Sequence, residues 1–257
     1  MIQSVRRATA ILLELGSGQR RLGVTELSDR LGLAKATVYG LLRALEADEM
    51  VQRDVESGKY RLGPVLLQLG NAFLEGHELR ARSMLWADSL ADRTEQAVRV
   101  GISMGSSILI VHHVFRPDTS VQILEVGATI PWHACALGKV IAAFRDDAEL
   151  EQKLAGPLPR LTGRTLVDRR ELERALERIR RDGVAIEDQE AIIGEAEIAA
   201  AVVDHAGHAV GAVGVVGPVE RLLVDGFARP DLAGAVKQVA RGLSRDMAGA
   251  RVYERGR

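Results

Sequence analysis

The sequence has one cysteine, Cys135, among its 257 residues. A single cysteine excludes an intrachain disulfide framework and a cysteine-cluster zinc site. Aromatic residues make up only 4% of the chain, which argues against stacked aromatic platforms for single-stranded nucleic acids. No apolar run is as long as a membrane span, and the first residues, MIQSVRRATAILLELG, carry charges and have no small-residue cleavage site. We therefore expect a cytoplasmic protein that has no membrane partner.

The chain also lacks an excess of charge of either sign. Its 34 Lys and Arg residues are balanced by 35 Asp and Glu residues, so the formal net charge at pH 7 is −1. Bulk positive charge therefore cannot hold the whole molecule to a nucleic acid, and any such contact must be local. Hydrophobic residues make up 47% of the chain, which at this length is enough for one large or two ordinary globular domains.

Helical spacing of apolar residues predicts three helices near the start of the chain. The first covers 4–15, and a short second helix covers 25–31, with Val24 or Thr25 near its start. Gly32 then supplies a residue that is free to take a positive φ, and a third helix begins after it. Helix, short helix, glycine turn and helix together form the helix-turn-helix pattern.

The stretch MVQRDVESGKYRLG follows the third helix directly. It predicts two short strands, 50–53 and 59–62, joined by a turn at 56–58. A hairpin in this position is a wing, so we assign residues 1–63 to a winged helix-turn-helix domain.

The next predicted helix, over 65–75, has apolar residues on more than one side. These residues are Leu66, Leu67, Leu69 and Phe73. We interpret 64–77 as a linker helix that packs between domains or subunits, because it has no domain of its own in which to bury this surface.

The remaining residues, 78–257, predict an α/β (α+β) domain. Short runs rich in Val and Ile predict six strands, at 97–103, 106–114, 120–126, 183–188, 196–204 and 208–217. The predicted helices of this domain cover 78–94, a stretch from about Ala136, two polar stretches of which the second is 168–181, and finally 232–248. Asp168 is the expected cap of the second polar helix, with Glu171 at the capping-box position.

Five stretches match a known protein family in order and spacing. They are QSVRRATAILLEL, LGLAKATVYGLLRALE, YRLG, HACALGKVIAAF and GVAIEDQEAIIGEAEIAAAVVDHAGHAVGAVGVVGP. Over essentially its full length the chain resembles the IclR family of transcriptional regulators. The resemblance implies a winged helix-turn-helix domain, a GAF-like effector-binding domain, and dimers or dimers of dimers that bind palindromic double-stranded operator DNA.

Three further phrases, HELRAR, LIVHHVFRPD and GPVERL, resemble family members that regulate glycerol operons. This resemblance implies a repressor that is released from its operator by a small-molecule effector such as glycerol or glycerol 3-phosphate. An alternative is an activator or repressor of a catabolic operon that responds to an aromatic or short organic acid. A third alternative, from another class, is an enzyme built on the C-terminal domain.

The third helix presents a basic and hydroxylic face. Val38, Leu42 and Leu45 recur at helical spacing and should be buried, which leaves the other side exposed. In a helix-turn-helix protein this exposed side enters the major groove, where Arg and Lys donate to guanine and Thr and Tyr reach thymine or phosphate. The residues that we expect to contact DNA from this helix are Lys35, Thr37, Tyr39 and Arg43.

The wing and one glycine complete the expected DNA interface. Ser57 and Lys59 lie in the wing, with Arg61 behind them, where they can touch the DNA backbone. Gly40 departs from the family pattern, because many members carry arginine there. A glycine inside a helix costs roughly 1 kcal/mol relative to alanine, and this one either allows close approach to DNA or reflects drift.

The effector site is expected at the motif WHACALGK, where a helix N-terminus with free amide groups favours an anion. The residues that the resemblance and this motif assign to the site are His133, Ala136, Leu137, Gly138, Glu187 and Glu197. Glu197 is a second departure, since family members often have cysteine there and a carboxylate is awkward for an anionic effector. Three options stay open: Glu197 points away, it accepts hydrogen bonds from a polyol, or the effector is not a phosphate.

The enzyme alternative depends on His133 and Cys135. In an extended stretch, residues two apart point the same way, so a thiol and an imidazole there would form a nucleophile pair. No orienting Asn or Asp is identifiable, and a lone cysteine is usually small core filler. The histidines that could suggest a metal are His112, His113, His205 and His208. Adjacent histidines in a strand face opposite sides, and we interpret all four as strand and turn residues without a ligand role, so we expect neither a metal site nor a cofactor.

Overall fold

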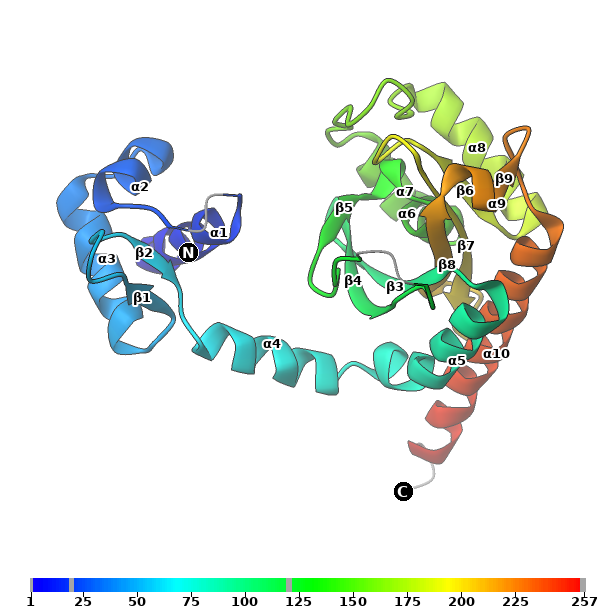
Figure 1. Ribbon diagram of the computed structural model, residues 1–257, viewed down its shortest axis with the longest axis horizontal. Helices are drawn as coiled ribbons and strands as arrows, with labels where there is room; N and C mark the ends of the chain where they lie inside the picture. Colours follow the sequence, from blue (N-terminus) through cyan, green and yellow to red (C-terminus); the bar gives the residue numbers. More distant parts are fainter. Residues whose placement is uncertain (1, 19–20, 119–121, 255–257) are drawn as a thin grey trace. The chain divides into compact units, whose positions relative to one another are not determined.

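The computed structural model describes residues 2–18, 21–118 and 122–254, and these fold into two units, Met1–Gly76 and His77–Arg257 (Figure 1). Each unit has its own hydrophobic core. Among the helices of the described ranges, none is long and apolar enough to cross a membrane.

The first unit contains the three expected helices and the hairpin, followed by a fourth helix. Its elements are α1 (Gln3–Gly16), α2 (Val24–Leu31), α3 (Lys35–Ala47), β1 (Val51–Arg53), β2 (Tyr60–Leu62) and α4 (Val65–Glu75). Gly32 ends α2 with φ 62°, the left-handed conformation that its lack of a side chain allows. The cap of α2 differs from the prediction. Gly23 is the N-cap, and its N–H donates to the Glu26 carboxylate at 2.7 Å.

The core of the first unit lies where the three helices meet the hairpin. Val38, Leu42 and Leu45 of α3 are buried against Ile11 and Leu15 of α1 and other apolar residues, as the helical spacing predicts. The antiparallel hairpin pairs Val51 with Leu62, and Leu22 forms a bridge with Tyr60 that ties the hairpin to the segment before α2. The helix-turn-helix and its wing therefore share one core.

The second unit is built on a six-stranded antiparallel sheet in the order β5-β4-β3-β8-β7-β6. The strands are β3 (Ala97–Met104), β4 (Ser107–Val114), β5 (Thr129–Pro131), β6 (Ala185–Asp188), β7 (Glu195–Val203) and β8 (Ala209–Pro218). Two shorter strands, β9 (Leu223–Val224) and β10 (Phe227–Ala228), form a separate small ribbon.

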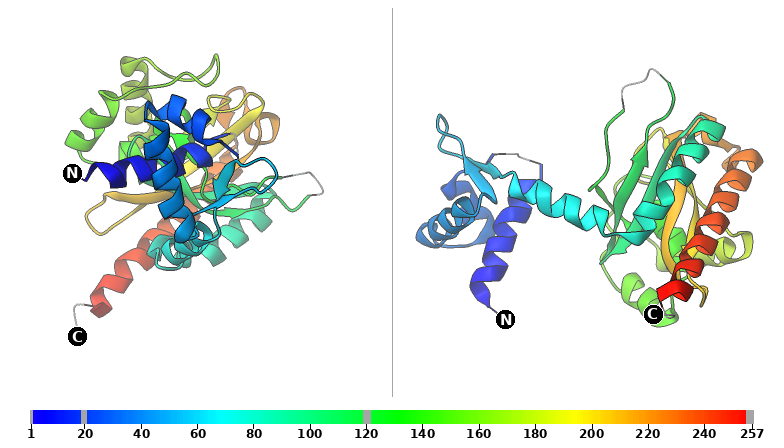
Figure 2. Two further views of the ribbon diagram at one scale, coloured as in Figure 1. Left: turned by 90° about the vertical axis from the view of Figure 1, so that its left-hand side faces the viewer. Right: turned by 90° about the horizontal axis from the view of Figure 1, so that it is seen from below.

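Helices cover the sheet on both faces. On one face α5 (Glu78–Thr94) and α10 (Pro230–Glu254) pack side by side (Figures 1 and 2). On the other face α6 (Ala136–Ala143) packs against β7 and β8, with α8 (Arg169–Asp182) beside it. The remaining helical elements are the 3-10 turn η1 (Trp132–Ala134), α7 (Asp147–Leu154) and α9 (Val219–Leu222).

Most of the predicted elements of the second unit are present within a few residues of their expected ends. Asp168 caps α8 by accepting from the Glu171 N–H at 3.0 Å, as the sequence predicts. The expected strand at 120–126 is an exception. Residues 120 and 121 lie outside the described ranges, and 122–125 have no regular structure.

The sixth strand of the sheet is instead β5, whose residues Thr129–Pro131 pair with the start of β4. In the segment predicted as a strand, Ile123 is 80% exposed, so its apolar side chain does not face the core. Gln122 exchanges two hydrogen bonds with the backbone of Arg116, at 2.7 and 3.0 Å, instead of pairing in the ladder of the sheet.

Candidate functional sites

The third helix of the first unit presents the expected polar face to solvent. Lys35, Tyr39 and Arg43 are exposed at successive turns of α3, and Thr37 is half-buried. Among the described residues, none makes a side-chain hydrogen bond or ion pair with Lys35, Tyr39 or Arg43. These side chains are therefore available to an external partner, and their donors match the acceptors of base edges and phosphates.

Gly40 lies on the same exposed side of α3. A Cβ placed on Gly40 meets nothing within 4 Å, so no neighbouring side chain or backbone of the unit requires glycine at this position. The helix is not distorted there, because α3 runs unbroken from Lys35 to Ala47.

The wing residues, by contrast, all have partners within the protein. Ser57 donates from its hydroxyl to Asp54 at 2.8 Å, and Arg61 donates to the Gln52 side-chain oxygen at 3.2 Å. Lys59 forms an ion pair with Glu26 at 3.1 Å. These contacts are at the surface, where ion pairs contribute little stability and exchange readily. A wing contact with DNA would therefore replace existing bonds rather than occupy free donors.

In the second unit, the N-terminus of α6 already holds a carboxylate of the protein itself. Glu197 of β7 accepts a hydrogen bond from the Leu137 N–H at 3.1 Å. The Gly138 N–H is directed to the Cys135 sulfur at 3.3 Å. A Cβ at Gly138 would clash with the Trp132 carbonyl group, so this tight turn requires glycine. The anion position that the sequence predicts is thus filled from within.

Glu197 is 1% exposed and faces one cation. Its other carboxylate oxygen, Oε1, lies 3.7 Å from Arg99 Nη1 and accepts no hydrogen bond from the described residues. Burial raises the pKa of Glu197, and the Arg99 charge and the α6 backbone bonds oppose this. Glu197 therefore lies inside the domain with an unused acceptor.

Sequence reasoning missed Arg99, which is 4% exposed and belongs to β3. Arg99 pairs with Glu125, and its Nη2 donates to Glu195 at 3.0 Å. The sequence signal that could have identified Arg99 is its position within the apolar run AVRVGIS, because a charged residue in a buried strand requires partners of opposite charge. One buried cation thus organises three carboxylates beside α6.

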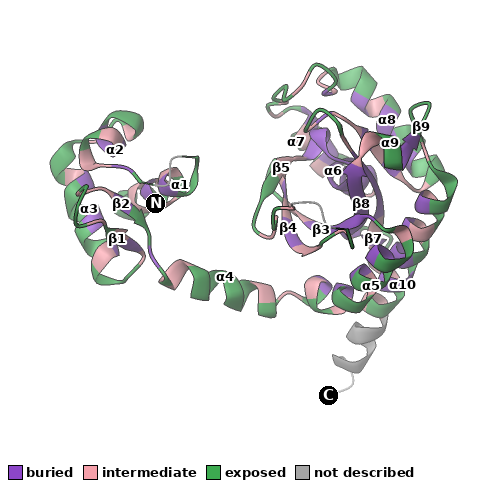
Figure 3. Ribbon diagram, viewed as in Figure 1, coloured by how far each residue is buried: buried purple, intermediate pink, exposed green. Residues whose placement is uncertain are grey.

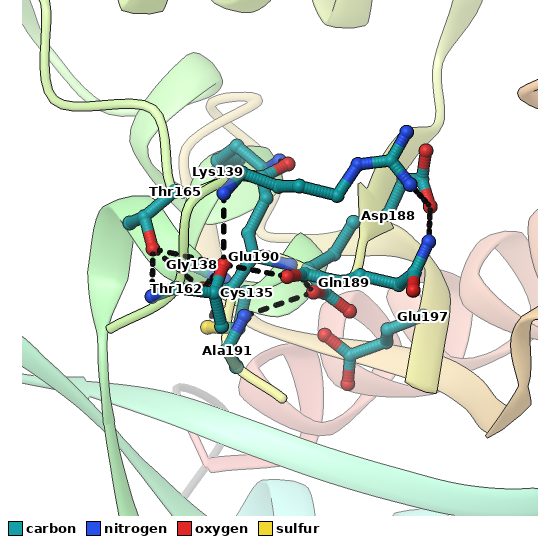
Figure 4. A network of polar contacts seen from close by, with 12 residues as sticks. Cys135, Gly138, Lys139, Thr162, Thr165, Asp188, Gln189, Glu190, Ala191 and Glu197 are labelled. Carbon is teal, nitrogen blue, oxygen red and sulfur yellow. Dashed lines mark hydrogen bonds and ion pairs between the residues drawn. The ribbon is translucent and has the colours of Figure 1, made fainter. Parts of the chain in front are cut away.

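A second buried polar cluster adjoins the first (Figure 4). Glu187 of β6 accepts from the backbone N–H groups of Glu190 and Ala191, the latter at 3.0 Å. Burial, with the nearby Glu197 charge, raises the pKa of Glu187 to about 8. Lys139 of α6, which is 2% exposed, forms an ion pair with Glu190. Glu187 and Glu197 are partners in the antiparallel pairing of β6 with β7, so the two residues lie next to each other.

His133 and Cys135 do not form the pair that an enzyme would need. The stretch is not extended as expected, because Trp132–Ala134 is a 3-10 turn. His133 Nε2 lies 3.0 Å from the Pro159 carbonyl oxygen, and burial lowers the pKa of the imidazole. Burial raises the pKa of the Cys135 thiol strongly, so the thiolate that acts as a nucleophile is not available. Within the described ranges, no group of three or more His, Cys, Asp or Glu side chains is arranged to hold a metal ion.

Comparison with known proteins gives matches to both units. The family profile described as "IclR helix-turn-helix domain" matches residues 4–55, and "Bacterial transcriptional regulator IclR C-terminal" matches residues 71–245. A glycerol operon regulatory protein of Streptomyces griseus is 47% identical over 97% of this chain and 98% of its own length. The Streptomyces coelicolor protein of that name is 44% identical over the same shares. The crystal structure of an IclR transcriptional regulator from Alicyclobacillus acidocaldarius has the same fold, with a TM-score of 0.82, 24% identity, and coverage of 95% of this chain and 98% of that chain.

Proposed function

Because this chain belongs to the IclR family of bacterial transcriptional regulators, we propose that it is a repressor of a glycerol operon, released by a small polyol. The family and the matched relatives are transcriptional regulators and not enzymes. The helix-turn-helix domain binds DNA, and the C-terminal domain binds small-molecule effectors. The names of the two Streptomyces relatives support the glycerol operon as the target. Operator binding places the action of the protein in the cytoplasm.

The proposed DNA contacts come from the exposed face of α3 and from the wing. Lys35 and Arg43 donate to guanine edges or phosphates, Thr37 and Tyr39 make the neighbouring contacts, and Ser57, Lys59 and Arg61 touch the backbone. The support for this assignment is the exposure of Lys35, Tyr39 and Arg43 without partners among the described side chains.

Tight binding to a palindromic operator requires two such domains, so we propose a dimer or a dimer of dimers. Two helices of the first unit, α1 and α4, support this because they carry exposed apolar side chains. Figure 3 colours most of α4 as exposed. At α1, the N-cap residue Ile2 is 71% exposed and Val5 is 60% exposed. On α4, Leu67 is 68% exposed and Leu69 is 53% exposed. Exposed apolar surface of this kind is typical of contacts between subunits.

The observation that carries the effector assignment is the hydrogen bond from Leu137 N–H to Glu197. An effector phosphate at the start of α6 would have to displace this carboxylate and tolerate the charges beside it. A neutral polyol instead donates hydroxyl protons to acceptors that the described residues leave unused. These acceptors are Glu197 Oε1, Glu190 Oε2 and His133 Nδ1. We therefore favour glycerol over glycerol 3-phosphate.

Titration calorimetry with both compounds tests this proposal. The wild-type protein should bind glycerol more tightly than glycerol 3-phosphate. Glu197→Ser should loosen glycerol and tighten glycerol 3-phosphate, because it removes both an acceptor and a negative charge. Glu173→Ser, which removes a partly exposed carboxylate from α8, is the matched control and should alter neither affinity. Thermal unfolding checks that both variants are folded.

The regulatory part of the proposal has a separate test. If glycerol weakens operator binding by some factor, the operator complex must bind glycerol more weakly by the same factor. Failure of the wild-type protein to bind either compound would refute the glycerol effector and leave the regulator assignment intact. Tighter binding of glycerol 3-phosphate by the wild type would refute the role given to Glu197.

A further inference from the structure

A basic groove of about 830 Å³ lies on the second unit, at the C-terminal end of α6 and not at the N-terminal end that meets Glu197. One wall is the side of α10 that carries Lys237, Arg241 and Arg245 at successive turns. The other wall is the last turn of α8, with Arg180 and Arg181. Figure 1 shows this end of α8 beside α10. The groove is therefore lined by cations from both layers of helices.

The charge of the groove is not balanced by its own lining. Among the described residues that line the groove, Asp182 is the single carboxylate, and it forms an ion pair with Arg181 at 3.0 Å. Among the described residues, none forms an ion pair with Lys237, Arg241 or Arg245. Like charges held in one groove repel each other unless an anion lies between them, so this surface favours a ligand with several negative charges.

The floor of the groove is an open edge of the sheet. β6 pairs with β7 only from Ala196 to Ala199, whereas β7 continues to Val203 along β8. Glu195 accepts from the Gln189 N–H on the β6 side, and Val203 donates to Ser244 Oγ on that same side, each at 2.9 Å. The backbone groups of every second residue of a strand point to the same edge, so the N–H and C=O of Ala201 face this edge as those of Glu195 and Val203 do. Ala201 lies beyond the last residue of β7 that pairs with β6.

We propose that this groove binds an extended acidic peptide segment of another protein, which pairs with the β7 edge at Ala201 and places its carboxylates against the two basic walls. Successive side chains of an extended peptide point to opposite faces. One set then meets Lys237, Arg241 and Arg245, and the other meets Arg180 and Arg181. The proposal adds a protein-binding surface to the regulator and does not depend on which effector it binds.

Two features favour a peptide over a small polyanion such as a polyphosphate. The Ala201 edge offers both a donor and an acceptor, which a peptide backbone matches and a phosphate does not. The three cations of α10 follow one side of the helix at four-residue intervals, about 6 Å apart, so they suit an elongated partner.

The test uses the full-length protein and a fluorescein-labelled hexaglutamate peptide, followed by fluorescence anisotropy. The double variant Arg241→Glu with Arg245→Glu should bind the peptide at least about tenfold more weakly, because attraction is replaced by repulsion. The matched control is Arg170→Glu with Arg174→Glu, which makes the same change of charge at exposed positions of α8 outside the groove. This control should bind like the wild type, and hexaglutamine should bind neither protein.

Backbone pairing is tested with a hexaglutamate in which every peptide nitrogen is methylated, since it keeps the side-chain charges and loses its backbone donors on both edges. We expect it to bind several-fold more weakly, and hydrogen exchange at the Ala201 amide to slow when the unmodified peptide binds. Equal binding of both peptides together with full competition by inorganic tripolyphosphate would show that the occupant is a small polyanion, and would overturn the proposal. Unchanged peptide binding by the Arg241 and Arg245 double variant would overturn it as well. A lower oligomeric mass of that variant in sedimentation would show that a second copy of the chain occupies the groove, which also contradicts the proposal.

Discussion

Glu187 gives the stability of the second unit a specific dependence on pH. Burial raises the pKa of this carboxyl from 4.5 to about 8 in the folded protein, whereas in the unfolded chain it keeps its ordinary value. Between these values the folded state holds a proton that the unfolded state releases. The contribution to stability is therefore fully present below about pH 4.5 and is lost as the pH rises through 8.

The variant Glu187→Gln removes this titration and keeps the shape of the side chain. The glutamine oxygen can still accept from the N–H groups of Glu190 and Ala191. Because each pKa unit corresponds to about 1.4 kcal/mol, the pKa difference sets an upper limit of roughly 5 kcal/mol on the effect. We expect the variant to gain roughly 2 to 4 kcal/mol of unfolding free energy over the wild type between pH 5 and pH 8.5, less than the upper limit because the pKa of the nearby Glu197 carboxyl is also raised by burial.

Urea unfolding at a series of pH values measures this gain. Both tryptophans of the chain, Trp86 and Trp132, lie in the second unit, so their fluorescence reports on that unit alone. Glu173→Gln, at a partly exposed position of α8, is the control and should follow the wild type at every pH. A difference between Glu187→Gln and the wild type that stays constant from pH 5 to pH 8.5 would refute the reasoning.

Three further predictions concern the first unit. Arg43→Ala should weaken operator binding by roughly 1 to 3 kcal/mol and relax specificity at one position of each half-site, whereas Lys59→Ala should weaken all DNA sequences alike. Operator affinity that is unchanged by both substitutions would contradict the proposed interface. Gly40→Ala should stabilise the first unit by about 1 kcal/mol in thermal or urea unfolding, since a Cβ there meets nothing within 4 Å. Lower operator affinity of this variant would indicate that the glycine allows close approach to DNA. Unchanged operator affinity would indicate drift. In sedimentation the wild type should be a dimer or larger at micromolar concentration, and the Leu67→Glu variant should have a lower oligomeric mass than the wild type. A monomeric wild type with full operator affinity would refute the proposed assembly.

The arrangement of the first unit was predictable because its signals are local. The buried stripe of Val38, Leu42 and Leu45 has helical spacing, and Gly32 stands where the chain must take a left-handed turn. The start of α2 was less predictable. Gly23 has no side chain with which to cap a helix, and the bond that fixes this end comes from Glu26, three residues later.

The errors in the second unit have a different cause, because they depend on contacts between distant segments. Residues 120–126 have the composition of a strand, but the edge of β4 is occupied by Thr129–Pro131. Arg99 meets Glu125, Glu195 and Glu197, which are far from it along the chain and share no local pattern with it. Sequence periodicity records which face of an element is apolar, but it contains no information on which buried charges meet across a sheet.

Glu197 illustrates how such a contact alters a functional inference. From the sequence, Glu197 either pointed away from the site, accepted hydroxyl groups or excluded a phosphate. The first option is wrong, because the side chain is 1% exposed and accepts from the Leu137 N–H. A helix start that holds an internal carboxylate has already used the attraction that would favour an effector anion. An anionic effector must therefore compete with the Glu197 carboxylate for the N–H groups at the start of α6. A neutral polyol only has to donate to acceptors such as Glu197 Oε1, which accept no hydrogen bond from the described residues. An effector shifts the conformation of the domain only if it binds better to one arrangement of this carboxylate than to another. The arrangement in which Glu197 accepts from the Leu137 N–H is the one that a polyol, under this proposal, leaves in place.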